Sequence, residues 1–115
     1  MIKNSIIALL ALFLMTTVDV QASEVKQWQT KLVKQISKYQ KYPRSAMNRE
    51  IEGRAIVRIV FNADGSVASH EVLESTGAKV LDREIPKVVN KLKMPQLPDG
   101  KETYSLKVPF TWLLG

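Results

Sequence analysis

Residues 54–67 read Arg-Ala-Ile-Val-Arg-Ile-Val-Phe-Asn-Ala-Asp-Gly-Ser-Val, and this run sets the architecture of the chain. Up to Asn62 the side chains alternate between two faces, which is the period of a β-strand with one dry and one mixed face. The dry face consists of Ala55, Val57, Ile59 and Phe61. Asp64-Gly65 follows, and Asp-Gly between two alternating runs is a strong hairpin signal. Residues 67–74 supply the returning strand, so the sequence predicts an antiparallel hairpin.

Helices are predicted on both sides of this hairpin. Residues 23–42 carry apolar side chains at spacings of three and four, and Ser23 is placed to cap the first turn. That apolar stripe consists of Val25, Trp28, Leu32, Ile36 and Tyr39. A shorter helix is predicted over residues 43–49, with Pro43 in its first turn. Residues 81–94 predict a further helix, with Asp82 as its cap and Pro86 delaying or bending its start.

The C-terminal residues 103–113 alternate again and predict a third strand. Its apolar positions are Leu106, Val108, Phe110 and Trp112. Pro109 cannot donate a hydrogen bond to a neighbouring strand, so this strand is expected at an edge of the sheet or with a local break. Three strands cannot bury both faces by themselves, so the helices must pack on one side. The predicted fold class is α+β: a two-layer sandwich of a three-stranded antiparallel sheet packed on helices.

The N-terminus has the three parts of a secretory signal. Lys3 precedes the apolar run of residues 6–15, and Val20-Gln21-Ala22 forms a small-x-small cleavage site. We therefore expect residues 1–22 to be a signal peptide, cleaved between Ala22 and Ser23. The alternative is a retained membrane anchor, but a spanning helix needs about 20 apolar residues, and Asp19 interrupts the run before that length.

Composition narrows the function classes. The 115 residues carry a formal net charge of +6, which suggests anionic neighbours, and export argues against nucleic acid as the partner. With no cysteine and one histidine, the chain offers no disulfide, no metal-thiolate site and no multi-histidine metal site. We expect no cofactor, no metal and, in the absence of a catalytic motif, no enzymatic activity. The lysines of residues 26–41 are either a solvated helix face or a contact to a membrane surface or acidic partner.

Several short segments, taken in order, are similar to one known family. They are Tyr42-Pro43-Arg44-Ser45-Ala46, Ile51-Glu52-Gly53, Asp64-Gly65-Ser66-Val67, Ser75-Thr76-Gly77, Leu81-Asp82, residues 95–100 and Val108-Pro109-Phe110. Together they resemble the C-terminal domain of TonB over about residues 28–113. We accordingly expect three parts: a signal peptide over residues 1–22, an N-terminal amphipathic helix over 23–42 and a TonB C-terminal-like domain over 43–115.

The resemblance implies a function. Domains of this family bind a short extended segment of an outer-membrane receptor by pairing it with their last strand, here residues 104–113, and the Tyr-Pro region lies close to that segment. The partner-binding residues that the resemblance implies are Tyr39, Tyr42, Pro43, Arg44, Tyr104, Ser105, Leu106, Lys107, Val108, Phe110 and Trp112. Residues of this set also fit structural roles: Tyr42 and Pro43 a helix end with a core tyrosine, and Phe110 and Trp112 the core.

Three hypotheses remain open from the sequence. The first is a periplasmic interaction module of a Gram-negative bacterium that binds a receptor or another envelope protein. TonB itself also carries a retained membrane helix and a long proline-rich spacer, which this sequence does not show, so we expect binding without force transmission. The second hypothesis is a short transducer component tethered to the inner membrane through uncleaved residues 1–22. The third is an envelope assembly factor that homodimerises through its edge strand.

Overall fold

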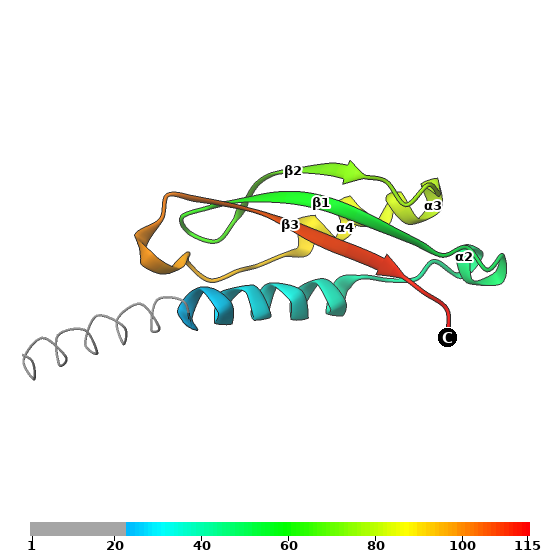
Figure 1. Ribbon diagram of the computed structural model, residues 1–115, viewed down its shortest axis with the longest axis horizontal. Coiled ribbons are helices and arrows are strands. Elements are labelled where there is room, and N and C mark those ends of the chain that lie inside the picture. The colour runs from blue at the N-terminus through cyan, green and yellow to red at the C-terminus, as the bar shows by residue number, and fades with distance from the viewer. Residues whose placement is uncertain (1–22) are drawn as a thin grey trace, which may run out of the picture.

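The structure is a computed structural model that describes residues 23–115; the predicted signal peptide, including Ala22, lies outside the described residues. The described part of the chain begins with the N-terminal helix, residues 23–39. The elements that follow are α2 (Arg44–Asn48), β1 (Gly53–Asn62), β2 (Val67–Glu74), α3 (Lys79–Asp82), α4 (Glu84–Lys91), the 3-10 turn η1 (Pro98–Gly100) and β3 (Thr103–Trp112). Figure 1 shows the N-terminal helix running beside the sheet.

The three strands form one antiparallel sheet in the order β2-β1-β3, so β1 is the central strand. The side chains of Ala55, Val57, Ile59 and Phe61 are fully buried, which confirms the dry face that their alternation predicts. The predicted hairpin is also present: Gly65 N donates to Asn62 O at 2.9 Å, and Asn62 N donates to Ser66 O at 2.8 Å.

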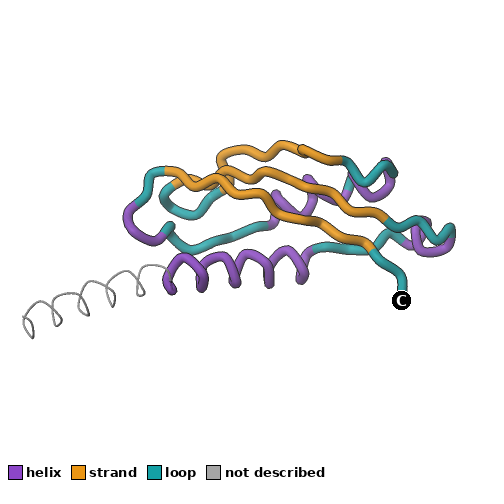
Figure 2. The backbone as a smooth tube through the Cα atoms, in the orientation of Figure 1, coloured by secondary structure: helices purple, strands orange, loops and turns teal. Residues whose placement is uncertain are grey.

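The helices form the second layer, against the dry face of the sheet (Figure 2). Trp28 of the N-terminal helix meets Phe61 of β1 edge to face, with ring centroids 4.8 Å apart, and its indole Nε1 donates to Pro95 O at 3.0 Å. One core joins buried residues of the N-terminal helix, α2, α3 and α4 with the buried faces of β1 and β3. Its helical members include Trp28, Leu32, Ile36, Leu81, Ile85, Val88 and Val89. The predicted two-layer α+β architecture is therefore confirmed.

The predicted helix over residues 81–94 is wrong in its boundaries, because the structure has two short helices. α3 ends at Asp82, a turn follows at Arg83, and α4 ends at Lys91. Pro86 explains the break: a continuous helix would need its missing N–H to reach the Asp82 carbonyl, and its ring would collide with that group. In α4 Pro86 lies in the first turn, where N–H groups have no helical partner anyway. The first helix likewise ends at residue 39, earlier than the predicted 42.

Asp82 is not the helix cap that the sequence suggests, since it lies at the last residue of α3. Its carboxylate instead holds the loop after β2, accepting hydrogen bonds from Ser75 Oγ at 2.6 Å, Thr76 N at 3.0 Å and Thr76 Oγ1 at 2.7 Å. Partial burial by itself raises the pKa of Asp82, but the hydrogen bonds from Ser75 and Thr76 outweigh it, so the pKa lies below its usual value.

We expect Asp82→Ala to lower the free energy of unfolding at pH 7 by about 1–3 kcal/mol, because three donors lose a charged acceptor. The folded-state pKa is lowered, so this contribution is present above the unfolded-state pKa and fades as the pH falls through the folded value. Urea denaturation at pH 7 and at strongly acidic pH measures both effects, with the exposed Glu102→Ala as the carboxylate control. Equal stability of Asp82→Ala and wild type at pH 7 would contradict this role.

Candidate functional site

β3 forms one edge of the sheet, in agreement with the position that Pro109 predicts. It pairs with β1 over ten residue pairs without a register shift, from Gly53 opposite Trp112 to Asn62 opposite Thr103. The pairing between β1 and β3 is therefore regular along the whole length of β3. A regular edge strand is a template for a further strand, since one row of its N–H and C=O groups has no partner within the sheet.

The opposite edge, β2, is less suitable. Its register with β1 shifts twice, between Ile56 and Val57 and again between Val60 and Phe61. Such irregularities leave a residue unpaired, increase the local twist and interrupt the ladder, which is one way in which proteins protect an edge from pairing. The two edges of this sheet therefore differ, and β3 is the more regular of the two.

The direction of the main chain in β3 follows from Pro109, which lies opposite Ile56. A proline fits a regular ladder only where its nitrogen faces away from the neighbouring strand. Residues of the same parity then direct their N–H and C=O groups toward the free side: Thr103, Ser105, Lys107 and Thr111. One contact supports this direction independently: Gln40 Nε2 donates to Thr111 O at 2.8 Å from outside the sheet.

The side chains of the predicted site divide between two faces. Val108, Phe110 and Trp112 are buried in the core, and Phe110 and Trp112 stack with ring centroids 6.2 Å apart. These side chains therefore hold β3 against the core, which is the structural role that the sequence also allowed for Phe110 and Trp112. Tyr104 and Leu106 are half-buried beside the core, whereas Ser105 and Lys107 are exposed on the opposite face.

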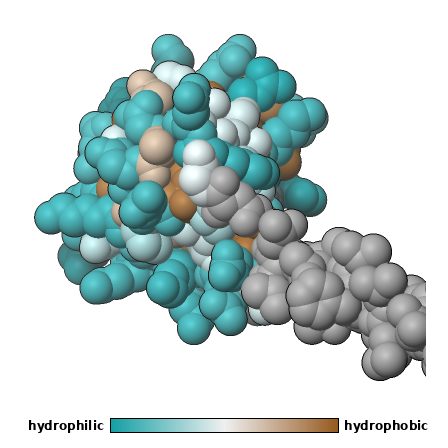
Figure 3. Space-filling view, turned by 90° about the vertical axis from the view of Figure 1, so that its left-hand side faces the viewer, coloured by the Kyte–Doolittle hydropathy of each residue, from teal (hydrophilic) through white to brown (hydrophobic). Residues whose placement is uncertain are grey.

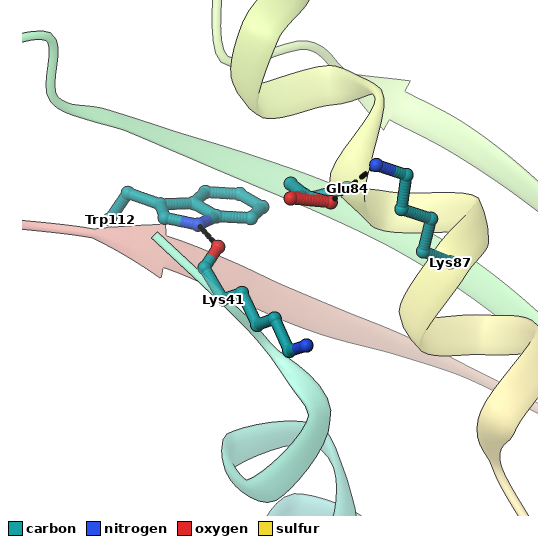
Figure 4. Close-up of polar contacts among 4 residues, drawn as sticks. All are labelled: Lys41, Glu84, Lys87 and Trp112. Carbon is teal, nitrogen blue, oxygen red and sulfur yellow. Dashed lines mark hydrogen bonds and ion pairs between the residues drawn. The ribbon is translucent and has the colours of Figure 1, made fainter. Parts of the chain in front are cut away.

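A shallow groove of about 270 Å³ lies at the C-terminal end of β3. It is lined by Ser37, Gln40, Lys41, Tyr42, Thr111, Trp112 and Leu113. The indole Nε1 of Trp112 donates to Lys41 O at 2.9 Å, and Figure 4 shows this bond joining β3 to the segment after the N-terminal helix. The structure thus brings the Tyr-Pro segment and the end of β3 together. Sequence reasoning missed Gln40, and it considered Lys41 only as one of the lysines of residues 26–41, because no periodicity or motif connects these two residues with the last strand.

The remaining predicted residues lie around this groove or beyond it. Tyr42 is half-buried, and its hydroxyl donates to the carbonyl of Ile51 just before β1. Burial raises the pKa of the Tyr42 phenol, and the nearby Glu52 carboxylate raises it further. Tyr39 is half-buried against the core, with the Lys38 ammonium 5.5 Å from its ring centroid.

Pro43 and Arg44 mark the start of α2. Pro43 stands at the N-cap position and is half-buried, and Arg44 begins the helix with an exposed side chain. Neither residue lines the groove beside β3. Of the Tyr-Pro region, the structure therefore brings Tyr42 to the groove, while Arg44 is left at the surface.

Two further properties concern residues 23–115 only. Within them, no three histidine or carboxylate side chains are grouped so that they could hold a metal ion. Among the helices of this part of the chain, none combines the length and the apolar character that crossing a membrane requires.

Comparison with known proteins gives a consistent result. Residues 38–114 match the family described as Gram-negative bacterial TonB protein C-terminal. TonB of Pseudomonas putida is 29% identical over 91 residues, which cover 76% of this chain and 37% of that protein. TonB of Helicobacter pylori is 34% identical over 79 residues, which cover 69% of this chain and 27% of that protein. The chain thus matches less than half the length of these relatives.

Solved structures agree with the sequence relatives. One solution structure of the Helicobacter pylori TonB C-terminal domain has a TM-score of 0.67 at 30% identity and covers 77% of this chain and 82% of that one. A second solution structure of the same domain has a TM-score of 0.54 at 30% identity, covering 74% and 91%. Since the family match spans α2, the whole sheet and the helices between its strands, this chain belongs to the TonB C-terminal domain family.

Proposed function

We propose that this domain is a non-enzymatic periplasmic module that binds an extended segment of an outer-membrane receptor, or of another envelope protein, as a fourth strand on β3. The proposal places the domain in TonB-dependent transport across the envelope. The observation that carries it is the regular edge of β3, which pairs with no further strand within residues 23–115 and where Ser105 and Lys107 direct N–H and C=O groups outward. Membership of the TonB C-terminal family supports the same assignment.

The edge limits where a partner strand can pair. The Thr111 carbonyl is already bonded to Gln40, and Pro109 offers a carbonyl without an N–H. Within residues 23–115, Ser105 and Lys107 are therefore, together with Thr103 at the start of the strand, the outward positions with both groups free for a partner. A segment of about five residues, at about 3.3 Å per residue, covers Ser105 to Pro109. Lengthening the contact past Pro109 requires the partner to displace Gln40 from Thr111.

The charges around the edge favour an acidic partner. Lys107 lies opposite Arg58, and Thr111 lies opposite Arg54, on the face of the sheet that the helices leave uncovered. Arg58 forms an ion pair with Glu71, with 3.8 Å between Arg58 Nη1 and Glu71 Oε2. No ion pair among residues 23–115 involves Arg54 or Lys107. Carboxylates on that face of the bound segment would meet three cationic side chains, which favours specificity and fast association.

An NMR titration of the exported protein tests the proposal. The probes are synthetic peptides that cover the N-terminal segments of the outer-membrane receptors of the host bacterium. We expect the amides of Ser105 and Lys107 to shift more than those of Leu106 and Val108, which already bond to β1. Saturable peptide binding that leaves residues 105–111 unperturbed would remove the support for strand addition.

The Pro109→Ala variant should bind such peptides about 2–10 times more tightly. The substitution adds one outward N–H at the edge, and a net hydrogen bond contributes about 0.5–1.5 kcal/mol. Isothermal titration calorimetry measures the affinity, and thermal unfolding verifies that the fold is unchanged. Pro95→Ala, an exposed proline in the loop before η1, is the matched control and should leave the affinity unchanged. A loss of affinity in a folded Pro109→Ala variant would count against the proposed edge.

The same edge favours a competing proposal, in which two copies of the chain pair through β3. Sedimentation velocity over a range of protein concentrations distinguishes the two. Concentration-dependent dimers that peptides do not dissociate would favour homodimerisation as the function of this edge.

We infer further that residues 1–22 are a signal peptide that is removed on export. The apolar run of residues 6–15 and the small residues before Ser23 support this. Mass spectrometry of the exported protein identifies its N-terminal residue. Ser23 at the N-terminus would eliminate the tethered transducer, whereas Met1 in the mature protein would support it.

A further inference from the structure

The N-terminal helix carries a face of a single charge sign. Four lysines, hereafter the lysine face, project from it: Lys26, Lys31, Lys34 and Lys38. At 3.6 residues per turn they fall within an arc of about 140°, on the side opposite the buried stripe of Trp28, Leu32 and Ile36. All four side chains are exposed. At the end of the molecule where this helix begins, the described surface is largely hydrophilic (Figure 3).

Within residues 23–115, no ion pair neutralises the positive charge of the lysine face. The ion pairs there join Arg58 to Glu71 and Lys87 to Glu84, and neither reaches this helix. Glu24 is the single acidic residue between Ser23 and Lys41, and the other exposed positions of the face are uncharged polar residues. Like charges four residues apart, as in Lys34 and Lys38, destabilise a helix slightly. A helix face that serves solubility alone gains more by mixing both signs.

The shape of this surface fits a flat partner. From Lys26 to Lys38 the helix extends about 18 Å, at 1.5 Å per residue. The hollow between Lys26, Thr30 and Lys34 is open and shallow, so it does not enclose a small anion. Val33, which is 58% exposed, adjoins the lysines and adds an apolar contact. Lysine side chains can lay their long stems along such a surface while the ammonium groups reach phosphates.

We propose that the lysine face docks the domain on an anionic phospholipid surface. The charge complementarity of four ammonium groups with lipid phosphates carries the inference, and each lysine near such a surface strengthens binding about fivefold. The N-terminal helix also contacts β3, since Gln29 Nε2 donates to Tyr104 Oη at 2.6 Å and the rings of Trp28 and Tyr104 are 5.6 Å apart. Docking through this helix therefore keeps the edge of β3 close to the membrane surface. The inference does not depend on strand addition, because lipid binding is measured without peptide.

Vesicle flotation of the exported protein tests the inference. The probes are vesicles of pure phosphatidylcholine and vesicles of phosphatidylcholine mixed with phosphatidylglycerol, at low salt. We expect binding to the mixed vesicles that high salt abolishes, since screening shortens the reach of the charges. The double variant Lys31→Gln, Lys34→Gln should bind about 25-fold more weakly, at about fivefold per lysine. Glutamine has nearly the helix propensity of lysine, so the helix should persist, as circular dichroism verifies.

The matched control is the double variant Lys79→Gln, Lys91→Gln, which removes the same charge from exposed positions on α3 and α4. It should bind the mixed vesicles almost as well as wild type. Equal partition of the wild-type protein onto the neutral and the mixed vesicles would overturn the proposal. An equal loss in the two double variants would also overturn it, because net charge and not the lysine face would then set the binding.

Discussion

Replacing Lys107 with proline is expected to weaken the binding of an extended partner segment about a hundredfold while the domain remains folded. Lys107 lies two residues before Pro109, so its N–H points away from β1 and belongs to the free edge. Proline removes that donor, leaves a partner carbonyl unsatisfied and places its ring where the added strand would lie. Since the bonds from β3 to β1 come from residues of the other parity, the sheet keeps its ladder. Calorimetry with the receptor peptides measures the loss.

The control for this prediction is Lys107→Ala, which removes the side chain and its charge but keeps the N–H. Its affinity should fall only as far as the lysine charge contributes, about three- to fivefold for an exposed charge pair. If Lys107→Ala and Lys107→Pro lose affinity equally, the side chain and not the main-chain edge makes the contact. If Lys107→Pro binds as wild type, the partner does not pair with β3.

Replacing Gly65 with alanine is expected to be among the most destabilising single substitutions in the chain. Gly65 has a φ of 91° in the β1–β2 turn, where a side chain is strained by about 1–2 kcal/mol. A Cβ atom there would also collide with the carbonyl oxygens of Met94 and Pro95. Both are main-chain atoms, held near the turn by the bond from Leu97 N to Ala63 O at 2.9 Å. Strain and overpacking together should cost about 2–5 kcal/mol of unfolding free energy.

Gly77 provides the matched control, since it has a similar φ of 85° but nothing within 4 Å of an added Cβ atom. Gly77→Ala should therefore cost only the backbone strain, about 1–2 kcal/mol. Urea denaturation of both variants separates the two contributions. If they are equally destabilised, the contact of Gly65 with the loop of residues 94–97 contributes nothing to stability.

The candidate site could be predicted in part. The resemblance pointed to the last strand and to Tyr42, and the structure places the strand at a free edge with Tyr42 in the groove beside its end. The sequence could not predict which chemical groups the edge of β3 presents to a partner. The side chains of Phe110 and Trp112 face the core, so the edge presents main-chain groups there. Gln40, which bonds the Thr111 carbonyl, carried no signal in the sequence.

The sequence by itself determined which side chains face the core. The alternation of residues 54–62 and the apolar stripe of Trp28, Leu32 and Ile36 are set by the local geometry of strands and helices, which repeats every two or about 3.6 residues. Pro109 likewise limited its strand to an edge position or a local break, because proline has no N–H to donate, and the strand order then placed it at an edge. Asp64-Gly65 identified the turn of the hairpin, because glycine adopts the positive φ that such a turn requires.

Only the tertiary structure decided which main-chain groups remain free. Trp112 reaches the Lys41 carbonyl, and Gln40 reaches that of Thr111, each across 71 residues of sequence. The irregular register of β2 and the close approach of Gly65 to the loop at Met94 likewise depend on how distant segments meet. Every residue carries the same N–H and C=O groups, so no sequence pattern distinguishes a bonded from an unbonded one. The free edge of β3 is therefore a property of the fold.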